Sequence, residues 1–566
     1  MVSNKVVLWS TVIASIALSG LFYVFSRIRC VHPHCVETYA NDSITILYSL
    51  YLIFIFIAAL LCKLISQLPY RIRYWLEKDI PVSPCRHPFI RYFWFEGSVL
   101  EFLTFLAILA LVTVNFVLYW NLMLSVSAHP LTEKAYWSAA LMGSGHMADV
   151  LLGLILIPLG RHSFLPNLLG IHIDAALRFH KRCGILLCLI SLAHGFVIWT
   201  KTVTFLDPPS YFYWTFNIGV QGPKWIFYVS KAGFMTTFGF ISGATIAVLW
   251  LFTFPIVRRR LYHFFYVVHI IFGPLMIISA GFHTSSVWYY SMPGAFLLLV
   301  DWIIRLYNYS KKKKALIRRE ECGYIRIDIF EKINVNVGSF VMIKIDELGW
   351  QISHPFTVAD DNESLVLLIK PTLFRSEWTN QLADLLPNGC LEKEITVRID
   401  GSFGYLKFDV SKTNLVACFV GGVGIAGALA VASHVLEYNV GSYLVFIFWA
   451  AREINAGKLS LLQKLINRQD SRLRVHLFGK AAGFSNDLEG EPSAVCDLQT
   501  SGVKGSLERM NPNELLQQVV LPCATRSAKV GVYTCGPQEL MDSVQKACEN
   551  GHKSVEIYFH RESFQW

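Results

Sequence analysis

Four histidines form two pairs with the same spacing, and each pair lies within a long apolar stretch. The pairs are His180 with His194 and His269 with His283, so fourteen residues separate the members of each. In an α-helix, fourteen residues advance by about 21 Å and nearly complete whole turns, so both imidazoles of a pair share one face. Neutral imidazole is a good ligand for iron. Two such helices side by side predict two stacked haems, each held by two histidines.

A different reading of these histidines is hydrogen bonding between membrane helices. The repeat favours ligation, because 17 histidines in 566 residues would give roughly half a pair at any chosen spacing by chance. Two histidines on each iron leave no open position at the metal. That arrangement favours electron transfer over oxygen binding.

The composition indicates a membrane protein with a water-soluble part. Hydrophobic residues make up 54% of the chain and the mean hydropathy is +0.44, which is too apolar for a wholly soluble protein. The formal net charge is +10, but the basic residues flank the apolar stretches, as at Arg258–Arg260 and Lys311–Lys314. Such clusters mark the cytoplasmic ends of membrane helices, so we expect a lipid bilayer and no nucleic acid as partner.

Eight apolar stretches are long enough to cross a bilayer of about 30 Å. They are 6–26, 44–62, 97–122, 136–159, 178–200, 236–257, 261–283 and 292–307. For 6–26, an uncleaved or cleaved signal segment is the alternative to a first span. The distribution of lysine and arginine places the N-terminus in the cytoplasm. Because one span separates the two histidine-bearing stretches, we expect them to run in parallel. His180 is then level with His269 near the cytoplasm, and His194 with His283 near the outside.

The sequence pattern changes after the lysine run that ends at Lys314. Short alternating strands up to about residue 408 predict a small antiparallel barrel. From residue 413 the order strand, glycine-rich turn, helix, strand predicts a parallel α/β unit. The expected domains are a membrane domain at 1–310, a barrel at 311–408 and an α/β domain at 409–566.

The glycine-rich turn predicts a dinucleotide site. Gly422, Gly424 and Gly427 form a GxGxxG pattern between a predicted strand and a predicted helix, where backbone amides can hold a pyrophosphate. The next strand is followed by Arg452, and no acidic residue stands at its end. An arginine there favours NADPH, whose 2′-phosphate it can bind, over NADH. A solvated surface arginine is the alternative.

Several motifs, in combination and in order, resemble the fungal ferric-chelate reductases, relatives of the NADPH oxidases. Besides the histidine pairs they are His354-Pro355-Phe356-Thr357, Gly421-Gly422-Val423-Gly424, Cys535-Gly536-Pro537 and Phe564-Gln565-Trp566. The likeness begins at about residue 97 and covers nearly all of the chain that follows. It implies a polytopic α-helical membrane domain binding two b-type haems, a cytoplasmic antiparallel β-barrel binding FAD, and a Rossmann-like α/β domain binding NADPH.

The resemblance also implies roles for single residues. The flavin is held by the HPFT motif and by the turn from Gly401 to Gly404, in which Ser402 replaces the family's proline. Trp566 stacks on the flavin. The residues implied to bind the dinucleotide are Gly421, Gly422, Gly424, Gly427, Arg452, Cys535, Gly536 and Pro537.

Two positions depart from the family pattern. Pro371-Thr372-Leu373 has no glycine where relatives carry a glycine-rich segment for the flavin phosphates, and Val423 replaces threonine or serine.

The expected function is transmembrane electron transfer. NADPH passes a hydride to FAD, and single electrons then pass through an inner and an outer haem to an acceptor outside. The resemblance implies a plasma-membrane ferric-chelate reductase, with cupric ion as a second candidate substrate and iron-uptake proteins as candidate partners. A superoxide-producing NADPH oxidase differs in the acceptor alone. A transporter or channel with proton-relaying histidines and a nucleotide-sensing domain is the alternative from another class.

Overall fold

The structure is a computed structural model and describes the chain from Asn4 to Glu562 with gaps. The residues outside the description within these limits are 29–40, 66, 69–71, 73–74, 77, 79, 81–94, 96, 128–129, 163–172, 206–230, 331–334, 350–352, 361–363, 372–377, 387–390, 439–442, 453–455, 480–495, 499–502, 507–508, 525–527 and 551–554. The chain divides into two compact units, Met1–Ile303 and Ile304–Trp566.

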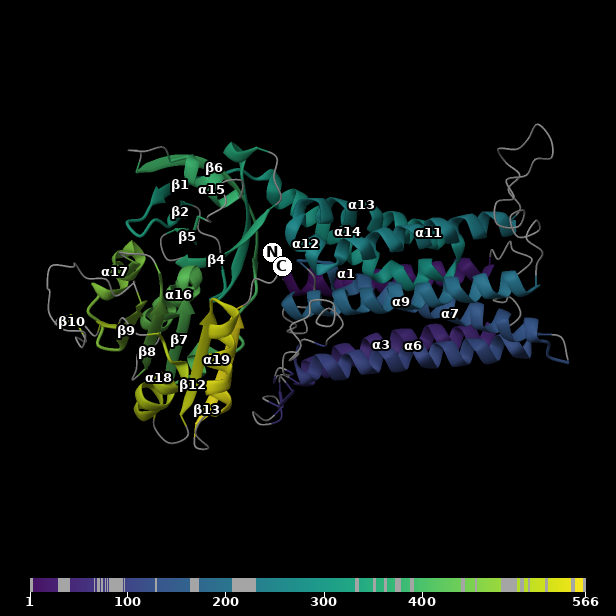
Figure 1. The fold of residues 1–566 in the computed structure, drawn as a ribbon, viewed down its shortest axis with the longest axis horizontal. Helices are drawn as coiled ribbons and strands as arrows, with labels where there is room; N and C mark the ends of the chain where they lie inside the picture. The colour runs from purple at the N-terminus through teal and green to yellow at the C-terminus, as the bar shows by residue number, and fades with distance from the viewer. Residues whose placement is uncertain are drawn as a thin grey trace. The chain divides into compact units, whose positions relative to one another are not determined.

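Long apolar helices build the first unit (Figure 1). Among the described residues, seven helices are long and apolar enough to cross a membrane. They are α1 (Asn4–Ile28), α3 (Asn41–Ile65), α6 (Val99–Ser125), α7 (Glu133–Leu156), α9 (Ile173–Phe205), α13 (Tyr262–His283) and α14 (Ser286–Ser310). An eighth helix, α11 (Lys231–Thr253), is apolar over the shorter stretch Thr237–Thr253. The prediction of a polytopic helical membrane domain is confirmed.

The predicted span at 236–257 is wrong at its end. Helix α11 stops at Thr253, and a short helix, α12 (Pro255–Arg260), carries the arginine triplet. Pro255 explains the break, because a proline clashes with a helical residue before it but suits the first turn of a new helix. Elsewhere capping sets the helix starts: the Ser98 hydroxyl accepts from the backbone N–H of Glu101 at 3.3 Å at the start of α6.

The second unit begins with a closed six-stranded barrel. Its strands are β1 (Lys313–Arg319), β2 (Ile325–Ile329), β3 (Phe340–Ile345), β4 (His354–Asp360), β5 (Leu365–Ile369) and β6 (Glu392–Phe403). They pair antiparallel in the order β1-β2-β5-β4-β3-β6. Alternate side chains such as Ile317, Ile327, Val341 and Leu367 fill the interior. The predicted antiparallel barrel is confirmed.

A seven-stranded sheet follows the barrel. Its strands are β7 (Leu415–Gly421), β8 (Leu444–Ala450), β9 (Leu473–Phe478), β10 (Cys496–Leu498), β11 (Val503–Ser506), β12 (Lys529–Cys535) and β13 (Glu556–Glu562). Their order is β10-β11-β9-β8-β7-β12-β13, and all neighbours are parallel except β10 and β11. The sheet's main helices are α16 (Ile425–Tyr438), α17 (Ser460–Ile466) and α19 (Gln538–Glu549). The predicted α/β fold is confirmed, and the chain reverses its winding between β7 and β12, where such sheets bind ligands.

Candidate functional site

Helices α9 and α13 bring the four paired histidines together at two levels. The ring centroids of His180 and His269 lie 5.9 Å apart, and those of His194 and His283 lie 6.2 Å apart. The ring planes cross at 79° and 76°. Such pairing at both levels requires the two helices to run in the same direction, as the spacing predicts.

The separation of the rings fits one metal ion within each pair. A histidine nitrogen lies about 2 Å from its metal and about 1.1 Å from its own ring centroid. Two imidazoles on opposite sides of one ion therefore have centroids about 6 Å apart. Both measured separations match this value.

Helix α7 supplies a hydrogen-bond partner at each level. Nδ1 of His180 lies 3.1 Å from the carbonyl oxygen of Ile155, which can only accept. Nδ1 of His194 lies 3.1 Å from the hydroxyl of Ser144, whose proton is directed to the Leu141 carbonyl at 3.0 Å. Both Nδ1 atoms therefore donate, and both Nε2 atoms keep the lone pair that a metal needs.

Two glycines leave space for the outer pair of histidines. A Cβ at Gly145 of α7 would lie 3.1 Å from Cε1 of His194. A Cβ at Gly239 of α11 would lie 2.9 Å from the ring of His283. A side chain at either position would displace an imidazole, so the helix surfaces are shaped around these rings.

The histidine levels suit a metal that brings most of its own ligands. No group of three or more His, Cys, Asp or Glu side chains that could hold a metal ion occurs in the described part of the chain. A haem iron takes four ligands from its porphyrin and needs two axial ones from the protein. Paired histidines therefore fit haem. Nδ1 of His269 is buried without a hydrogen-bond partner among the described residues.

A carboxylate fixes two arginines beside the inner level. Glu101 of α6 accepts from Nε and Nη2 of Arg178 at 2.9 and 2.6 Å, and from Arg182 at 3.4 Å. The Arg182 guanidinium also stacks 3.6 Å above the ring of Phe95. Both arginines lie within two residues of His180 on α9, so positive charge is held at the same level of this helix as the inner pair.

In the second unit, the two predicted dinucleotide motifs meet at the carboxyl ends of β7 and β12. A Cβ at Gly421 would lie 2.8 Å from the Pro537 ring, and one at Gly424 would lie 2.6 Å from the carbonyl oxygen of Cys535. Gly422 has φ +58°, which favours glycine. The turn therefore needs glycine, and its amides begin helix α16 at the ligand-binding edge of the sheet.

The two segments predicted to hold the flavin lie on either side of one residue, Phe340 of β3. It pairs with Thr357 on β4 and with Phe403 on β6. Gly401 and Gly404 have φ of +83° and +80°, so the end of β6 turns sharply through two left-handed residues.

The rest of the HPFT motif lies along β4. Pro355 faces Met342 of β3 in the strand register. The rings of His354 and Phe356 pack 4.6 and 5.5 Å from that of Trp378.

Glu562 was not predicted, and it joins these motifs. Its carboxylate accepts from the Thr357 hydroxyl at 2.8 Å and from the hydroxyl of Tyr533. A Cβ at Gly427 would lie 3.0 Å from the same carboxylate. Glu562 lies outside the motifs that the sequence analysis identified. Its position two residues before Phe564-Gln565-Trp566 is the one sequence feature that could have marked it as a site residue.

The electrostatic environment of Glu562 keeps its neighbours protonated. Burial first, and then the charge of Glu562, raise the pKa of the Cys535 thiol well above its usual value. The same two causes, in the same order, raise the pKa of the Tyr533 hydroxyl. Cys535 is therefore a neutral thiol that contributes shape and a weak hydrogen-bond donor, and it is not a nucleophile.

Two predicted residues have no described contacts in the site. Arg452 follows β8 and is exposed at the carboxyl edge of the sheet. Trp566 lies outside the described residues, as do Thr372 and Leu373. The stacking of Trp566 on a flavin stays a prediction. The effect of the missing glycine after Lys370 on the flavin contacts also stays untested.

Two sequence families match this chain over the segments just described. Residues 144–280 match the family described as Ferric reductase like transmembrane component, and residues 307–407 match an FAD-binding domain. The first match contains His180, His194 and His269 and ends three residues before His283. The second contains all six strands of the barrel.

Curated relatives are about a quarter identical to this chain over the residues that align. Ferric reduction oxidase 8, mitochondrial, of Arabidopsis thaliana is 24% identical over 52% of this chain and 40% of its own length. Ferric reductase transmembrane component 6 of Saccharomyces cerevisiae is 24% identical over 71% and 56%. A superoxide-generating NADPH oxidase heavy chain of Dictyostelium discoideum is 23% identical over 84% and 98%. The chain spans less than half the length of Arabidopsis relatives, 40–46% for four of them.

Solved structures show weaker likeness. A ferredoxin NADP+ reductase from Neisseria gonorrhoeae with bound FAD and NADP covers 44% of this chain and 98% of its own at 11% identity, with a TM-score of 0.30. A flavohemoglobin from Malassezia yamatoensis with FAD and heme covers 76% and 99% at 13% identity, with a TM-score of 0.32. Likeness at this level supports no conclusion about this chain.

Proposed function

We propose that this chain, which matches the ferric reductase family, moves electrons from NADPH through FAD and two b-type haems to ferric chelates across a membrane. The observation that supports the proposal most is the pair of histidine levels, with ring centroids 5.9 and 6.2 Å apart, on two parallel helices. When bound, flavin and haem supply the electron-carrying chemistry that amino-acid side chains lack.

The proposed work of the membrane unit is to hold the two haems apart and fully ligated. His180 and His269 bind the inner one, and His194 and His283 the outer one. The fourteen-residue spacing separates the two levels by about 21 Å, most of a hydrocarbon core of about 30 Å. Because each iron would be held by two histidines, these residues would favour transfer of an electron over binding of a substrate at iron.

We also propose a role for the two arginines beside His180. The Arg178 and Arg182 guanidinium groups, held by Glu101, stabilise negative charge near His180. A haem held there would gain negative charge on reduction, and the two guanidinium groups would favour that reduction compared with a purely apolar bundle.

In the second unit, we assign the nucleotide and flavin to the edge where β4, β7, β12 and β13 meet. The glycine-rich turn from Gly421 to Gly427 would bind the pyrophosphate, and Arg452 the 2′-phosphate of NADPH. Thr357 and Glu562 would orient the groups that face the flavin ring. Cys535 would line the nicotinamide pocket, and Trp566 would cover the flavin until the nicotinamide displaces it.

Ferric chelates are the proposed acceptor because relatives carry ferric reductase names. One of them is Ferric/cupric reductase transmembrane component 2 of Saccharomyces cerevisiae, 25% identical over 71% of this chain and 57% of its own length. Cupric ion is therefore a second proposed substrate. We place the protein in the plasma membrane with its FAD and NADPH domains in the cytoplasm, where it would support iron-uptake proteins.

Superoxide production is the second candidate function. The observation that favours it is the Dictyostelium NADPH oxidase heavy chain, whose match covers 84% of this chain and 98% of that protein. The two candidates differ in what accepts the electron beyond the level of His194 and His283.

The test is electron transfer across sealed vesicles that contain the full chain. NADPH is supplied on the side of the soluble unit, and a membrane-impermeant ferric chelate on the other. We expect ferrous iron to form on the far side at a rate that superoxide dismutase does not change. Dismutase-sensitive dye reduction that persists without iron would favour the oxidase. Absence of any NADPH-driven reduction on the far side would contradict both and favour a transporter or channel.

A further inference from the structure

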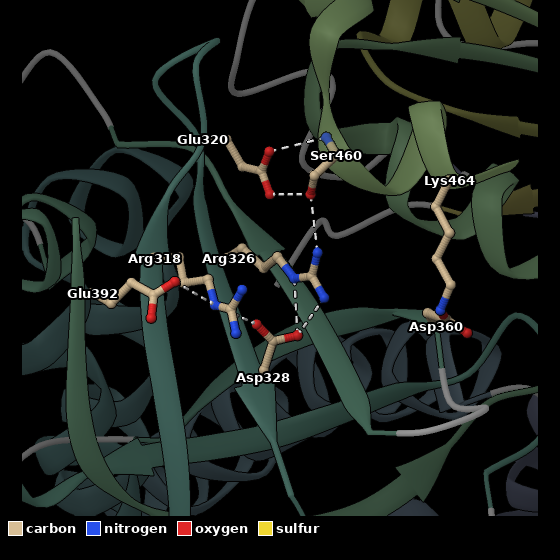
Figure 2. A network of polar contacts seen from close by, with 8 residues as sticks. All are labelled: Arg318, Glu320, Arg326, Asp328, Asp360, Glu392, Ser460 and Lys464. Atoms are coloured by element: carbon tan, nitrogen blue, oxygen red, sulfur yellow. Dashed lines mark hydrogen bonds and ion pairs between the residues drawn. The ribbon is translucent and has the colours of Figure 1, made fainter. Parts of the chain in front are cut away.

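The barrel and the nucleotide-binding sheet are joined by polar contacts at helix α17, as Figure 2 shows. Glu320, in the turn between β1 and β2, accepts from the backbone N–H of Ser460 at 3.0 Å and from its hydroxyl at 2.5 Å. Arg326 of β2 donates to the same hydroxyl oxygen at 2.9 Å. The first residue of α17 is therefore held by two side chains of the barrel.

Two ion pairs extend this contact on both sides of Ser460. Lys458 lies 3.6 Å from Glu321 of the β1–β2 turn. Lys464 lies 3.6 Å from Asp360 at the end of β4. We call the barrel residues Glu320, Glu321, Arg326 and Asp360, with their partners Lys458, Ser460 and Lys464, the clasp.

The clasp is organised in advance on the barrel side. Arg326 donates to Asp328 through Nε at 2.8 Å and through Nη2 at 2.6 Å. Asp328 is almost fully buried, and Arg318 lies 3.4 Å from its other oxygen. Because Asp328 holds the Arg326 side chain independently of Ser460, the contact between Arg326 and α17 requires little further ordering of that side chain.

The position of the clasp relates it to the nucleotide edge of the sheet. Strand β8 ends at Ala450, and the chain passes Arg452 before it reaches Lys458 and Ser460. Arg452 stands two residues after the end of β8, and the short helix Ala456–Lys458 leads into the clasp residues Lys458 and Ser460. Four positions of chain join Arg452 to Ala456, so the clasp limits how far Arg452 can move away from the segment that it holds.

We propose that the clasp positions Arg452 for the adenosine end of NADPH, through the segment Ala456–Ser460 that follows it, and that Glu320 is its main positioning residue. The inference rests on the proposed function, because it takes Arg452 as the group that meets the 2′-phosphate. Glu320 does not touch the nucleotide. It lowers the amount of ordering that the nucleotide must bring about on binding, and so raises affinity without changing hydride transfer.

The first test compares binding with reaction in the full-length, FAD-loaded chain. NADPH is mixed rapidly with the protein, and loss of the oxidised flavin absorbance is followed over a range of NADPH concentrations. For Glu320→Ala we expect the apparent Kd for NADPH to rise about tenfold. The limiting rate at saturation should stay at the wild-type value, because Thr357, Cys535 and Glu562 are unchanged.

Changes at Ser460 give a graded second test. Ser460→Ala loses the hydroxyl contacts but keeps the backbone bond to Glu320, so its Kd should rise less than that of Glu320→Ala. Ser460→Asp places a carboxylate against Glu320, and the repulsion should raise Kd more than Ser460→Ala does. The double variant Glu320→Ala/Ser460→Ala should raise Kd by less than the product of the two single increases. Both substitutions remove the same hydrogen bond between Glu320 and the Ser460 hydroxyl.

Glu392→Gln is the matched control. Glu392, the first residue of β6, lies 3.3 Å from Arg318 in the same group of charges and is not one of the clasp residues. Its Kd for NADPH should equal that of the wild type. Discrimination between NADPH and NADH should fall in Glu320→Ala and be kept in Glu392→Gln, because NADH lacks the phosphate that Arg452 would bind.

The outcomes separate this inference from the proposed function. An unchanged Kd in Glu320→Ala, or equal effects in Glu320→Ala and Glu392→Gln, would overturn the clasp. If Glu320→Ala fails to retain FAD, the comparison of Ser460→Asp with Ser460→Ala decides, and equal Kd values would overturn it. A wild-type flavin that NADPH does not reduce at all would instead contradict the proposed function.

Discussion

The two candidate sites of this chain are built in different ways. The histidine levels of the membrane unit use side chains from two helices, and each helix repeats histidine after fourteen positions. The cluster around Glu562 uses Thr357, Gly427 and Tyr533, which come from three other elements spread over about two hundred positions. A regular helix turns spacing in sequence into spacing in space, whereas the second site exists only after β4, β12, β13 and α16 have packed.

This difference predicts how each site responds to damage. Loss of one histidine removes one ligand from one level and leaves the other level and the flavin untouched. Loss of Glu562 disturbs two hydrogen-bond partners at once, because its carboxylate is shared between Thr357 of the barrel and Tyr533 of the sheet.

The largest effect is expected for His194→Ala. Without His194 the proposed outer haem would have His283 as its one protein ligand, and reduction of the far-side acceptor should fall by about 100-fold or more. Flavin reduction by NADPH, measured by rapid mixing, should not change. His263→Ala is the control, since His263 is an exposed histidine on the same helix as His269. Full activity in His194→Ala would remove the basis of the ligand assignment.

Glu562→Gln is expected to slow flavin reduction by NADPH roughly tenfold to a hundredfold, because the bonds that orient Thr357 and Tyr533 become weaker. It should also change the titration of Cys535. The negative charge of Glu562 helps to raise the pKa of this thiol, so its removal lowers that pKa and alkylation at alkaline pH should be faster.

Glu539→Gln is the matched control for Glu562, because Glu539 is largely exposed and pairs with Arg509 at 3.2 Å. Identical flavin reduction rates in Glu562→Gln and Glu539→Gln would show that the shared carboxylate has no part in positioning.

A smaller effect is expected for Gly239→Ala in the membrane unit. The new Cβ would lie 2.9 Å from the His283 ring, which must shift to make room. We expect acceptor reduction to fall by about threefold, with an altered visible spectrum of the outer level. Gly243→Ala on the same helix meets nothing within 4 Å and should behave as the wild type. An equal response from both glycines would mean that Gly239 does not shape the histidine site.

The smallest effect is expected for Asp346→Asn in the barrel. Asp346 accepts from Arg398 at 2.6 and 3.0 Å, and this bond lowers the pKa of the carboxyl below its ordinary 3.8. The side chain is 28% exposed, so we expect a loss of about 0.5–1 kcal/mol at neutral pH.

Because the folded pKa is lowered, the Asp346 contribution is present above pH 3.8 and is lost as pH falls through the folded pKa. The temperature of FAD release from the full chain should therefore differ between wild type and Asp346→Asn at neutral pH and converge in acid. Glu394→Gln removes a highly exposed partner of Lys314 at 4.0 Å and should leave this temperature unchanged. A difference between wild type and Asp346→Asn that persists in acid would contradict the assignment.

Much of the fold could be predicted from sequence because it depends on local patterns. Apolar length predicts the helices, alternation predicts the barrel strands, and the repeat from His180 to His194 predicts a shared face. Ser144 and Ile155 could not be predicted, because a serine and a backbone carbonyl on a third helix carry no mark of the histidines they meet. The predicted end of one span lay beyond Pro255, where hydrophobicity continued but the proline broke the helix.

The second site was predictable in its motifs and not in its connections. GxGxxG and HPFT can be recognised as motifs in the sequence. Glu562, Glu320 and Ser460 are polar residues outside any motif, of types that are common on protein surfaces. Their contacts depend on how the barrel and the sheet pack together, which no local pattern encodes.

The most direct measurement is the visible spectrum of the purified full-length chain, oxidised and after addition of NADPH. We expect two b-type haems per chain, both with two histidine ligands, and reduction of both by NADPH in the presence of FAD. In His194→Ala we expect that the inner haem alone keeps its spectrum and is still reduced. Pure, folded protein without a Soret band, or a spectrum that is unchanged in His194→Ala, would contradict the proposed pair of haems.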